Sequence, residues 1–155
     1  MSFSVICPVF VDSNILAYAR DARDLRKNTL ALDWLSCLAK TRTGRLSWQV
    51  LIEFYAIATH PKKLAMAVAA VQADVLSLQH WRPVAPSVDL FKTAWAVQNR
   101  YNFSWWDSTI VAAAILTNCK ILLSEDLQHE QVVNHTLQII NPFAENAPVP
   151  GVCSQ

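Results

Sequence analysis

Short apolar runs rich in β-branched residues alternate with longer amphipathic segments along this chain of 155 residues. The strand-like runs are Val5–Val11, Lys120–Leu123 and Leu137–Ile140. Runs this short, bounded by polar or turn-forming residues, are typical of buried strands. Strands that alternate with helices favour a parallel sheet, because each crossover connection needs a helix to return the chain. The sequence therefore predicts an α/β fold with helices on both faces of a parallel sheet.

The segments between these runs carry helical signals. The clearest is an apolar stripe with alternating steps of four and three, which fits core or dimer packing better than a ligand site. It consists of Leu64, Val68, Val71, Val75 and Leu78. Further helices are predicted over Asn28–Lys40, from a Ser47 cap to Thr59, from a Ser87 cap to about Asn102, and over Glu125–His135. A short strand is predicted at Trp81–Val84, and another at Leu46.

Composition excludes several classes of protein. The content is 53% hydrophobic and 16% charged, which suits one compact domain and excludes general disorder. The only glycines are Gly44 and Gly151, so the chain has neither a G-x-G-x-x-G turn nor a P-loop. The four cysteines form no C-x-x-C pair, which argues against zinc and favours a reducing setting. A net charge of +1 means that any basic surface must be local.

The expected location is the cytoplasm. The first residues lack the basic flank and apolar core of a signal peptide. The longest uncharged apolar stretch, Ser108–Cys119, is too short to cross a bilayer. We expect one domain over residues 1–143 and a flexible C-terminal tail over residues 144–155, where prolines and polar residues follow the last strand.

Four acidic residues stand in apolar surroundings. Asp12 ends the first strand, and Asp126 follows the strand Lys120–Leu123 closely. Glu53 is the only charged residue between Arg45 and His60, with no lysine or arginine three or four positions away. Asp107 precedes an alanine-rich helix, three residues after Ser104, in the arrangement of a capping box. Buried charge is costly unless something compensates it, so a shared cation is the simplest common explanation.

The topology favours convergence of these acids. In open parallel sheets, sites form beyond the carboxyl ends of the strands, where Asp12 and Asp126 lie. Asp107 begins a helix, whose dipole favours negative charge, and Glu53 has apolar neighbours at i−3 and i+4. Magnesium or manganese prefers such oxygen ligands, and two ions can promote attack of water on a phosphodiester.

Each acid also has a structural interpretation. Asp12 can cap a turn, Asp107 can serve only in its capping box, and Asp126 can begin a helix at Ser124. Glu53 resists such an interpretation best, because nothing within helical reach would neutralise it. Taken together, the four are harder to explain by structure alone.

Four short motifs, taken in order, resemble those of a known family. They are Val11–Leu16, Leu51–Phe54, Trp106–Ser108 and Leu123–Leu127. They are similar to the motifs of PIN domains, and most of all to the VapC-type toxins of bacterial toxin–antitoxin pairs. The similarity continues to Ile139–Phe143, which resembles the family's final strand.

The resemblance implies a PIN-like three-layer α/β/α sandwich and a magnesium-dependent endoribonuclease, often homodimeric and silenced by a cognate antitoxin. It assigns the family's acidic quartet to Asp12, Glu53, Asp107 and Asp126 as metal ligands, with manganese as a substitute metal. It also matches a polar residue to Asn14 and a small hydroxyl residue to Ser124. One departure is Glu130, at a place where relatives commonly carry glycine.

The sequence indicates less about which residues contact the substrate. Basic residues after the first acid can line the mouth of a cleft for RNA phosphate or form an ordinary solvated face; they are Arg20, Arg23, Arg26 and Lys27. Trp105 and Trp106 can stack an unpaired base or divide between core and surface.

Two other function classes remain. One is a non-catalytic PIN-like module that binds RNA or protein, against which the intact quartet counts. The other is a phosphatase with Asp12 as nucleophile, which would need a second acid at the position of Asn14.

Overall fold

A five-stranded sheet organises the molecule, in a computed structural model that describes residues 7–150. The strands are β1 (Val9–Val11), β2 (Gly44–Arg45), β3 (Ile121–Leu123), β4 (Val132–Val133) and β5 (Leu137–Ile140). They lie in the order β2-β1-β3-β5-β4, and every neighbouring pair is parallel except β4 with β5. The predicted central, mainly parallel sheet is confirmed.

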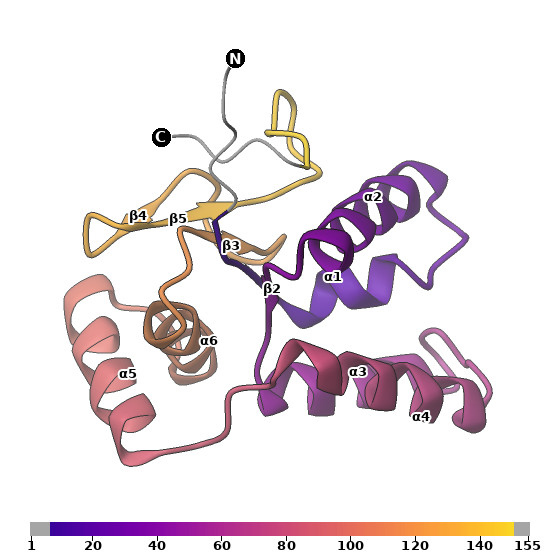
Figure 1. Ribbon diagram of the computed structural model, residues 1–155, viewed down its shortest axis with the longest axis horizontal. Coiled ribbons are helices and arrows are strands. Elements are labelled where there is room, and N and C mark those ends of the chain that lie inside the picture. Colours follow the sequence, from indigo (N-terminus) through magenta and orange to yellow (C-terminus); the bar gives the residue numbers. More distant parts are fainter. Residues whose placement is uncertain (1–6, 151–155) are drawn as a thin grey trace.

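Helices flank this sheet on both sides. They are α1 (Ser13–Tyr18), α2 (Leu25–Thr41), α3 (Trp48–Thr59), α4 (Val68–Ser77), α5 (Val88–Tyr101) and α6 (Trp105–Leu116), with a 3₁₀ turn η1 (Leu78–Trp81). Figure 1 shows α1 and α2 on one side of the strands and α5 and α6 on the other. The protein is therefore a three-layer α/β/α sandwich, as predicted.

The centre of the sheet forms the core. Phe10 of β1, Leu122 of β3 and Ile139 of β5 are fully buried. β1 and β3 are buried at every residue, which explains why they are apolar throughout, whereas β5 also carries the half-buried Gln138. Helix α6 is buried along Ser108–Ala114, and its small alanines let it pack closely between neighbouring elements.

Serine caps begin three of the helices where the sequence predicts them. Ser47 Oγ accepts a hydrogen bond from Val50 N (3.3 Å) at the start of α3. Ser87 does the same for α5, and Ser104 Oγ accepts from Asp107 N (3.1 Å) at the start of α6. These bonds satisfy amides that lack partners within the helix.

The predicted helix Glu125–His135 is wrong. After β3 the chain turns, forms β4 and pairs it with β5. Glu130 and His135 adopt left-handed backbone conformations, with φ of 68° and 61°, which a helix cannot contain. A left-handed φ like that of Glu130 is one that glycine adopts without steric cost.

Two further predictions need correction. Trp81–Val84 is not a strand: Trp81 ends η1, Arg82 is left-handed, and only Val84 forms a bridge, to Ser47. The helix predicted from Leu64 starts at Val68, because the preceding residues turn back onto the end of α3 through the bond from Met66 N to Ala58 O (2.8 Å).

The two ends of the predicted domain are only partly described. The strand predicted from Val5 is seen from Val9, and Val5 lies outside the described residues, as do residues 151–155 of the predicted tail. Residues 144–150 form turns and contribute, with α2, to a cavity of about 470 Å³. Within residues 7–150, no helix combines the length and apolar character needed to span a membrane.

Candidate metal and nuclease site

The carboxyl ends of β1, β3 and β5 lie level with one another. Val11, Leu123 and Ile140 are aligned in register, so the chain leaves all three strands at the same edge. Asp12 N donates to Leu123 O (3.0 Å) in continuation of the ladder. This alignment brings Ser124 beside Asp12, and Ser124 Oγ donates a hydrogen bond to Asp12 Oδ2 (2.8 Å).

Asp12 is the most buried of the four predicted acids. Its side chain is 8% exposed, and it caps α1 by accepting from Ser13 N (2.7 Å). Burial raises the pKa of Asp12 to about 6, an effect opposed by the bonds from Ser124 and Ser13 and increased by the negative charges of Glu53 and Asp126. Asp12 is thus both a helix cap and a carboxylate whose ionised form lacks a compensating cation.

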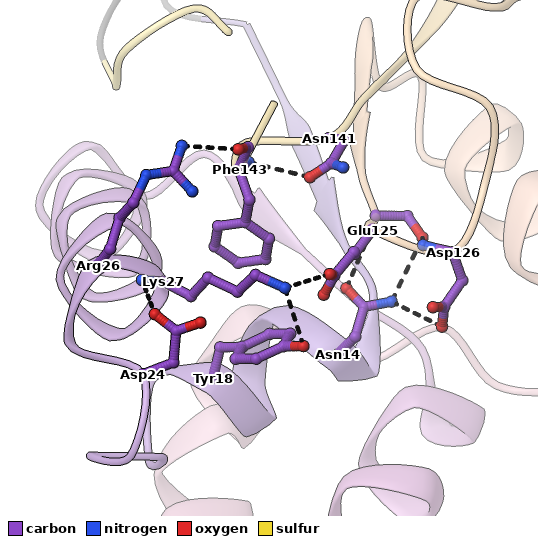
Figure 2. Close-up of polar contacts among 10 residues, drawn as sticks. Asn14, Tyr18, Asp24, Arg26, Lys27, Glu125, Asp126, Asn141 and Phe143 are labelled. Atoms are coloured by element: carbon purple, nitrogen blue, oxygen red, sulfur yellow. Dashed lines mark hydrogen bonds and ion pairs between the residues drawn. The ribbon is translucent and has the colours of Figure 1, made fainter. Parts of the chain in front are cut away.

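Asn14 connects the first and last acids. Its amide Nδ2 lies 3.3 Å from Asp12 Oδ2, 3.4 Å from Ser124 Oγ and 3.2 Å from Asp126 Oδ2. Its Oδ1 accepts from Glu125 N (3.2 Å), as Figure 2 shows. Asp126 N in turn donates to Ser124 Oγ (3.2 Å). One neutral amide therefore fixes the loop after β3 against the start of α1.

Glu53 reaches the same edge from α3. Ser13 Oγ donates to Glu53 Oε2 (2.9 Å), and Gln49, one turn earlier, donates to Glu53 Oε1 (3.0 Å). Both donors are neutral, so the charge of this half-buried carboxylate is solvated by hydrogen bonds and not by an ion pair.

Asp107 lies in the first turn of α6 and is only indirectly connected to the others. Within residues 7–150 its carboxylate makes no hydrogen bond or ion pair. The connection runs through Gln49, which approaches Trp106 O (3.5 Å) and accepts from Thr109 Oγ1 (2.5 Å). The structure thus links Asp12, Glu53 and Asp126 through single hydroxyl or amide groups, and within residues 7–150 the Asp107 carboxylate shares none of these bonds.

The four acids are oxygen ligands of the kind that bind hard cations, but they do not converge closely enough to enclose one. Among the described residues, no three His, Cys, Asp or Glu side chains approach closely enough to hold a metal ion. The donors that do gather are all carboxylate, hydroxyl or amide groups, which suit magnesium or manganese and not zinc. The pKa of Asp12 is raised mainly by burial and further by the charges of Glu53 and Asp126, and a bound cation would oppose both effects by favouring the ionised carboxylate.

Basic residues after Asp12 are largely occupied by partners. Arg20 pairs with Asp74, Arg23 with Asp21, and Lys27 with Glu125. Lys27 Nζ also donates a hydrogen bond to Tyr18 Oη (3.2 Å) and lies over the Tyr18 and Phe143 rings. Figure 2 shows Lys27 between these two aromatic side chains. Arg26 donates to the carbonyl of Phe143 (2.7 Å). Arg20 therefore connects the turn after α1 to α4, and Arg26 and Lys27 connect α2 to the segments after β5 and β3.

An apolar hollow borders the site beside Glu53. Its volume is about 670 Å³, and it is lined mainly by residues of α3, α5 and α6, including Trp48, Phe91, Trp105 and Trp106. Trp105 packs against Phe91 with ring centroids 5.5 Å apart, whereas Trp106 is 66% exposed. The two adjacent tryptophans therefore divide between packing and surface.

Three contributors to the site were not singled out from the sequence. Ser13 bonds Glu53, Gln49 orients the same acid, and Thr109 holds Gln49. The spacing of Gln49 and Glu53 by four residues was a signal, because such positions face one another on a helix. Nothing in the sequence indicates Thr109, which meets Gln49 only through the packing of α6 against α3.

Comparison with known proteins agrees with this architecture. The PIN domain family matches residues 9–134. The structure resembles VapC20 of Mycobacterium tuberculosis, a toxin that cleaves the sarcin–ricin loop, with a TM-score of 0.56, 23% identity and coverage of 76% of this chain and 91% of that one. It also resembles VapBC2 of Rickettsia felis, solved bound to a DNA fragment from its promoter, with a TM-score of 0.60, 18% identity and coverage of 86% and 98%. No curated protein matches the sequence significantly.

Proposed function

The chain belongs to the PIN domain family, and from that premise we propose that it is a metal-dependent endoribonuclease, the toxin of a type II toxin–antitoxin pair in the cytoplasm. The observation that carries the proposal is the gathering of Asp12, Asn14, Ser124 and Asp126 where β1 and β3 end, with Glu53 reaching the same edge through Ser13. The fold shared with VapC20, which cleaves an RNA loop, supports the substrate class.

The metal ligands in this proposal are Asp12, Glu53, Asp107 and Asp126. Together with water they would hold Mg²⁺ or Mn²⁺, whose charge lowers the pKa of a nucleophilic water and stabilises the leaving oxygen. The protein's own contribution is positional. Ser124 and Ser13 hold the Asp12 carboxylate by hydrogen bonds, and Asn14 holds Asp126 without adding a cation that would compete with the metal.

The neutral character of these supporting groups matters for RNA hydrolysis. A lysine or arginine among the acids would neutralise them permanently and weaken a divalent cation's binding. Ser13, Asn14 and Gln49 satisfy the carboxylate oxygens while leaving their charge intact. Asp12, Glu53 and Asp126 therefore retain a mutual repulsion that a bound metal would reduce.

The test of the function is cleavage of RNA by the purified protein. We expect activity that requires Mg²⁺ or Mn²⁺, disappears in EDTA, and leaves 5′-phosphate and 3′-hydroxyl ends, since attack by water needs no 2′-hydroxyl. Products with 2′,3′-cyclic phosphates, or undiminished cleavage in EDTA, would refute metal-assisted hydrolysis.

A non-catalytic module that binds RNA or protein is the second candidate. The specific observation in its favour is that, in the described part of the chain, the acids do not converge to a closed metal-binding group. It would be supported if the protein bound RNA without cleaving it in either metal.

Two protein partners belong to the proposal, a cognate antitoxin and a second copy of the chain. Large apolar side chains are exposed on α3, α5 and α6, including Ile52 (67%), Trp95 (52%) and Trp106 (66%). Exposed apolar surface of this kind supports a contact with another protein. Light scattering of the protein alone and with its antitoxin would test both associations.

A further inference from the structure

A second polar surface lies at the opposite edge of the sheet, where β1 and β2 begin. The last turn of α2, the start of β2 and η1 enclose a cavity of about 740 Å³ there. Its polar lining includes Arg42, Arg45, His80 and Arg82, called the arginine pocket below. Gly44 pairs in register with Val9, at the other end of β1 from Asp12, so the pocket and the acids lie at opposite ends of the strands.

The cations of the arginine pocket lack acidic partners. In the sequence, residues 34–52 and 75–88 contain no Asp or Glu, and no carboxylate lines the cavity within residues 7–150. The guanidinium groups of Arg42 and Arg82 make no hydrogen bond or ion pair with any described residue. Arg45 donates only to neutral acceptors, the carbonyls of Arg42 (3.2 Å) and Gly44 (2.8 Å).

The pocket is held in shape by its backbone. Arg42 is the C-cap of α2 and Arg82 is the C-cap of η1, and both adopt left-handed conformations that turn the chain sharply. Trp81 covers the backbone at Gly44 so closely that a Cβ there would lie 2.3 Å from the ring. The tryptophan therefore fixes Arg82 relative to the strand that follows Arg42.

The acidic edge makes a separate basic surface useful to a ribonuclease. Clustered carboxylates repel phosphate, and Arg20 and Arg23 in the turn between α1 and α2, like Lys27 at the start of α2, are already paired with acids. Unpaired guanidinium groups, in contrast, can bind phosphate through two parallel hydrogen bonds. We propose that the arginine pocket binds the phosphate backbone of the substrate RNA at a distance from the cleavage site. This inference rests on the proposed ribonuclease function.

The experiment measures RNA binding without cleavage. Fluorescence anisotropy of a fluorescein-labelled oligouridylate is followed in EDTA at several salt concentrations, for the wild type and for Arg42→Gln/Arg82→Gln. We expect Kd to rise roughly tenfold or more, because two charge-assisted contacts are lost. The slope of log K against log salt should fall by about 1.4, since each phosphate contact on a single strand contributes about 0.7.

The matched control is Lys62→Gln/Lys63→Gln, which removes the same charge from an exposed turn between α3 and α4. It should leave the slope nearly unchanged. Melting curves establish that each variant is folded. If the double variant does not fold, Arg82→Gln alone replaces it, and the expected change in slope is then half as large. In cleavage assays of long RNA, the arginine variant should raise KM and leave kcat unchanged.

The outcomes separate this inference from the function on which it rests. If the wild type binds and cleaves RNA but the arginine variant behaves like the lysine control, the arginine pocket is not an RNA site and the nuclease assignment stands. If the variant loses affinity for duplex DNA but not for RNA, the inference is also overturned. A wild type that neither binds nor cleaves RNA overturns both.

Discussion

The carboxyl and amino edges of the sheet differ in the sign of the charged side chains that they carry and in how those side chains are bonded. At the carboxyl edge, Asp12 and Glu53 are buried or half-buried and bonded by neutral hydroxyl and amide groups. At the amino edge, Arg42 and Arg82 are exposed and have no carboxylate within the described residues to pair with. The formal net charge of +1 gives no sign that acidic and basic side chains are separated in this way. The comparison teaches that near-neutral composition is compatible with an acidic pole and a basic pole on one small domain.

A second contrast concerns the basic residues themselves. Arg20, Arg23 and Lys27 lie close to Asp12 in sequence, yet each has an acidic partner. The arginines of the amino edge are farther away in sequence, and none of them has an acidic partner within residues 7–150. Proximity along the chain was therefore a poor guide to which cations remain available for phosphate.

The largest expected effect lies at the carboxyl edge. Asp12→Asn should reduce the rate of RNA cleavage by at least about 100-fold. Loss of a residue that only supports a metal ligand already lowers activity by up to about 100-fold, and loss of a ligand itself should cost at least as much. Asp33→Asn, an exposed acid on α2, is the matched control and should cleave normally. Initial rates in Mg²⁺ decide the matter, and a variant that kept a tenth of wild-type activity would remove Asp12 from the site.

The next effect concerns stability and pH in the metal-free protein. Burial raises the pKa of Asp12 from 3.8 to about 6, so between these values the folded state holds a proton that the unfolded state has released. The free energy of unfolding should therefore fall by about 3 kcal/mol as pH rises through this window. Urea unfolding in EDTA should find Asp12→Asn more stable than the wild type above pH 6, with the gap closing toward pH 3.8. A gap independent of pH would contradict this origin.

A smaller effect is expected from crowding at the amino edge. Gly44→Ala should destabilise the fold by about 1–3 kcal/mol, the usual range for an inserted methyl group, because the new Cβ would meet Trp81 at 2.3 Å. Trp81→Leu in the same background removes part of the clash, so it should recover some of the loss. Chemical denaturation of the two variants measures both effects, and an unaffected Gly44→Ala protein would show that Trp81 does not fix the arginine pocket.

The smallest effect tests the paired cations in the turn between α1 and α2. Arg20→Gln/Arg23→Gln should change the salt slope of RNA binding much less than Arg42→Gln/Arg82→Gln, because Asp74 and Asp21 already occupy these guanidinium groups. Anisotropy under identical conditions makes the comparison direct. Equal slopes for the two double variants would show that intramolecular pairing does not decide which arginines reach phosphate.

Local signals in the sequence determined much of the fold. Ser47, Ser87 and Ser104 cap the helices that they were predicted to cap, because a side-chain oxygen satisfies a free amide within three residues. The strand runs ending at Val11, Leu123 and Ile140 are equally clear in the sequence, since strands covered on both faces are mainly apolar. The helix predicted over Glu125–His135 is wrong because the left-handed turns in this segment carry residues other than glycine. The glycine that usually indicates such a turn is therefore missing from the sequence.

The sequence by itself singled out Asp12, Glu53 and Asp126, which the structure links at the carboxyl edge, because carboxylates in apolar runs are costly and so stand out. Only the tertiary structure decided how they are held. Asn14 and Asp126 are 112 positions apart and meet because β1 and β3 are neighbours in register. It also decided which cations remain unpaired, since pairing depends on which helices pack together. The physical reason is that hydrogen bonds and ion pairs act over a few ångströms in space, whereas composition and spacing report only on neighbours along the chain.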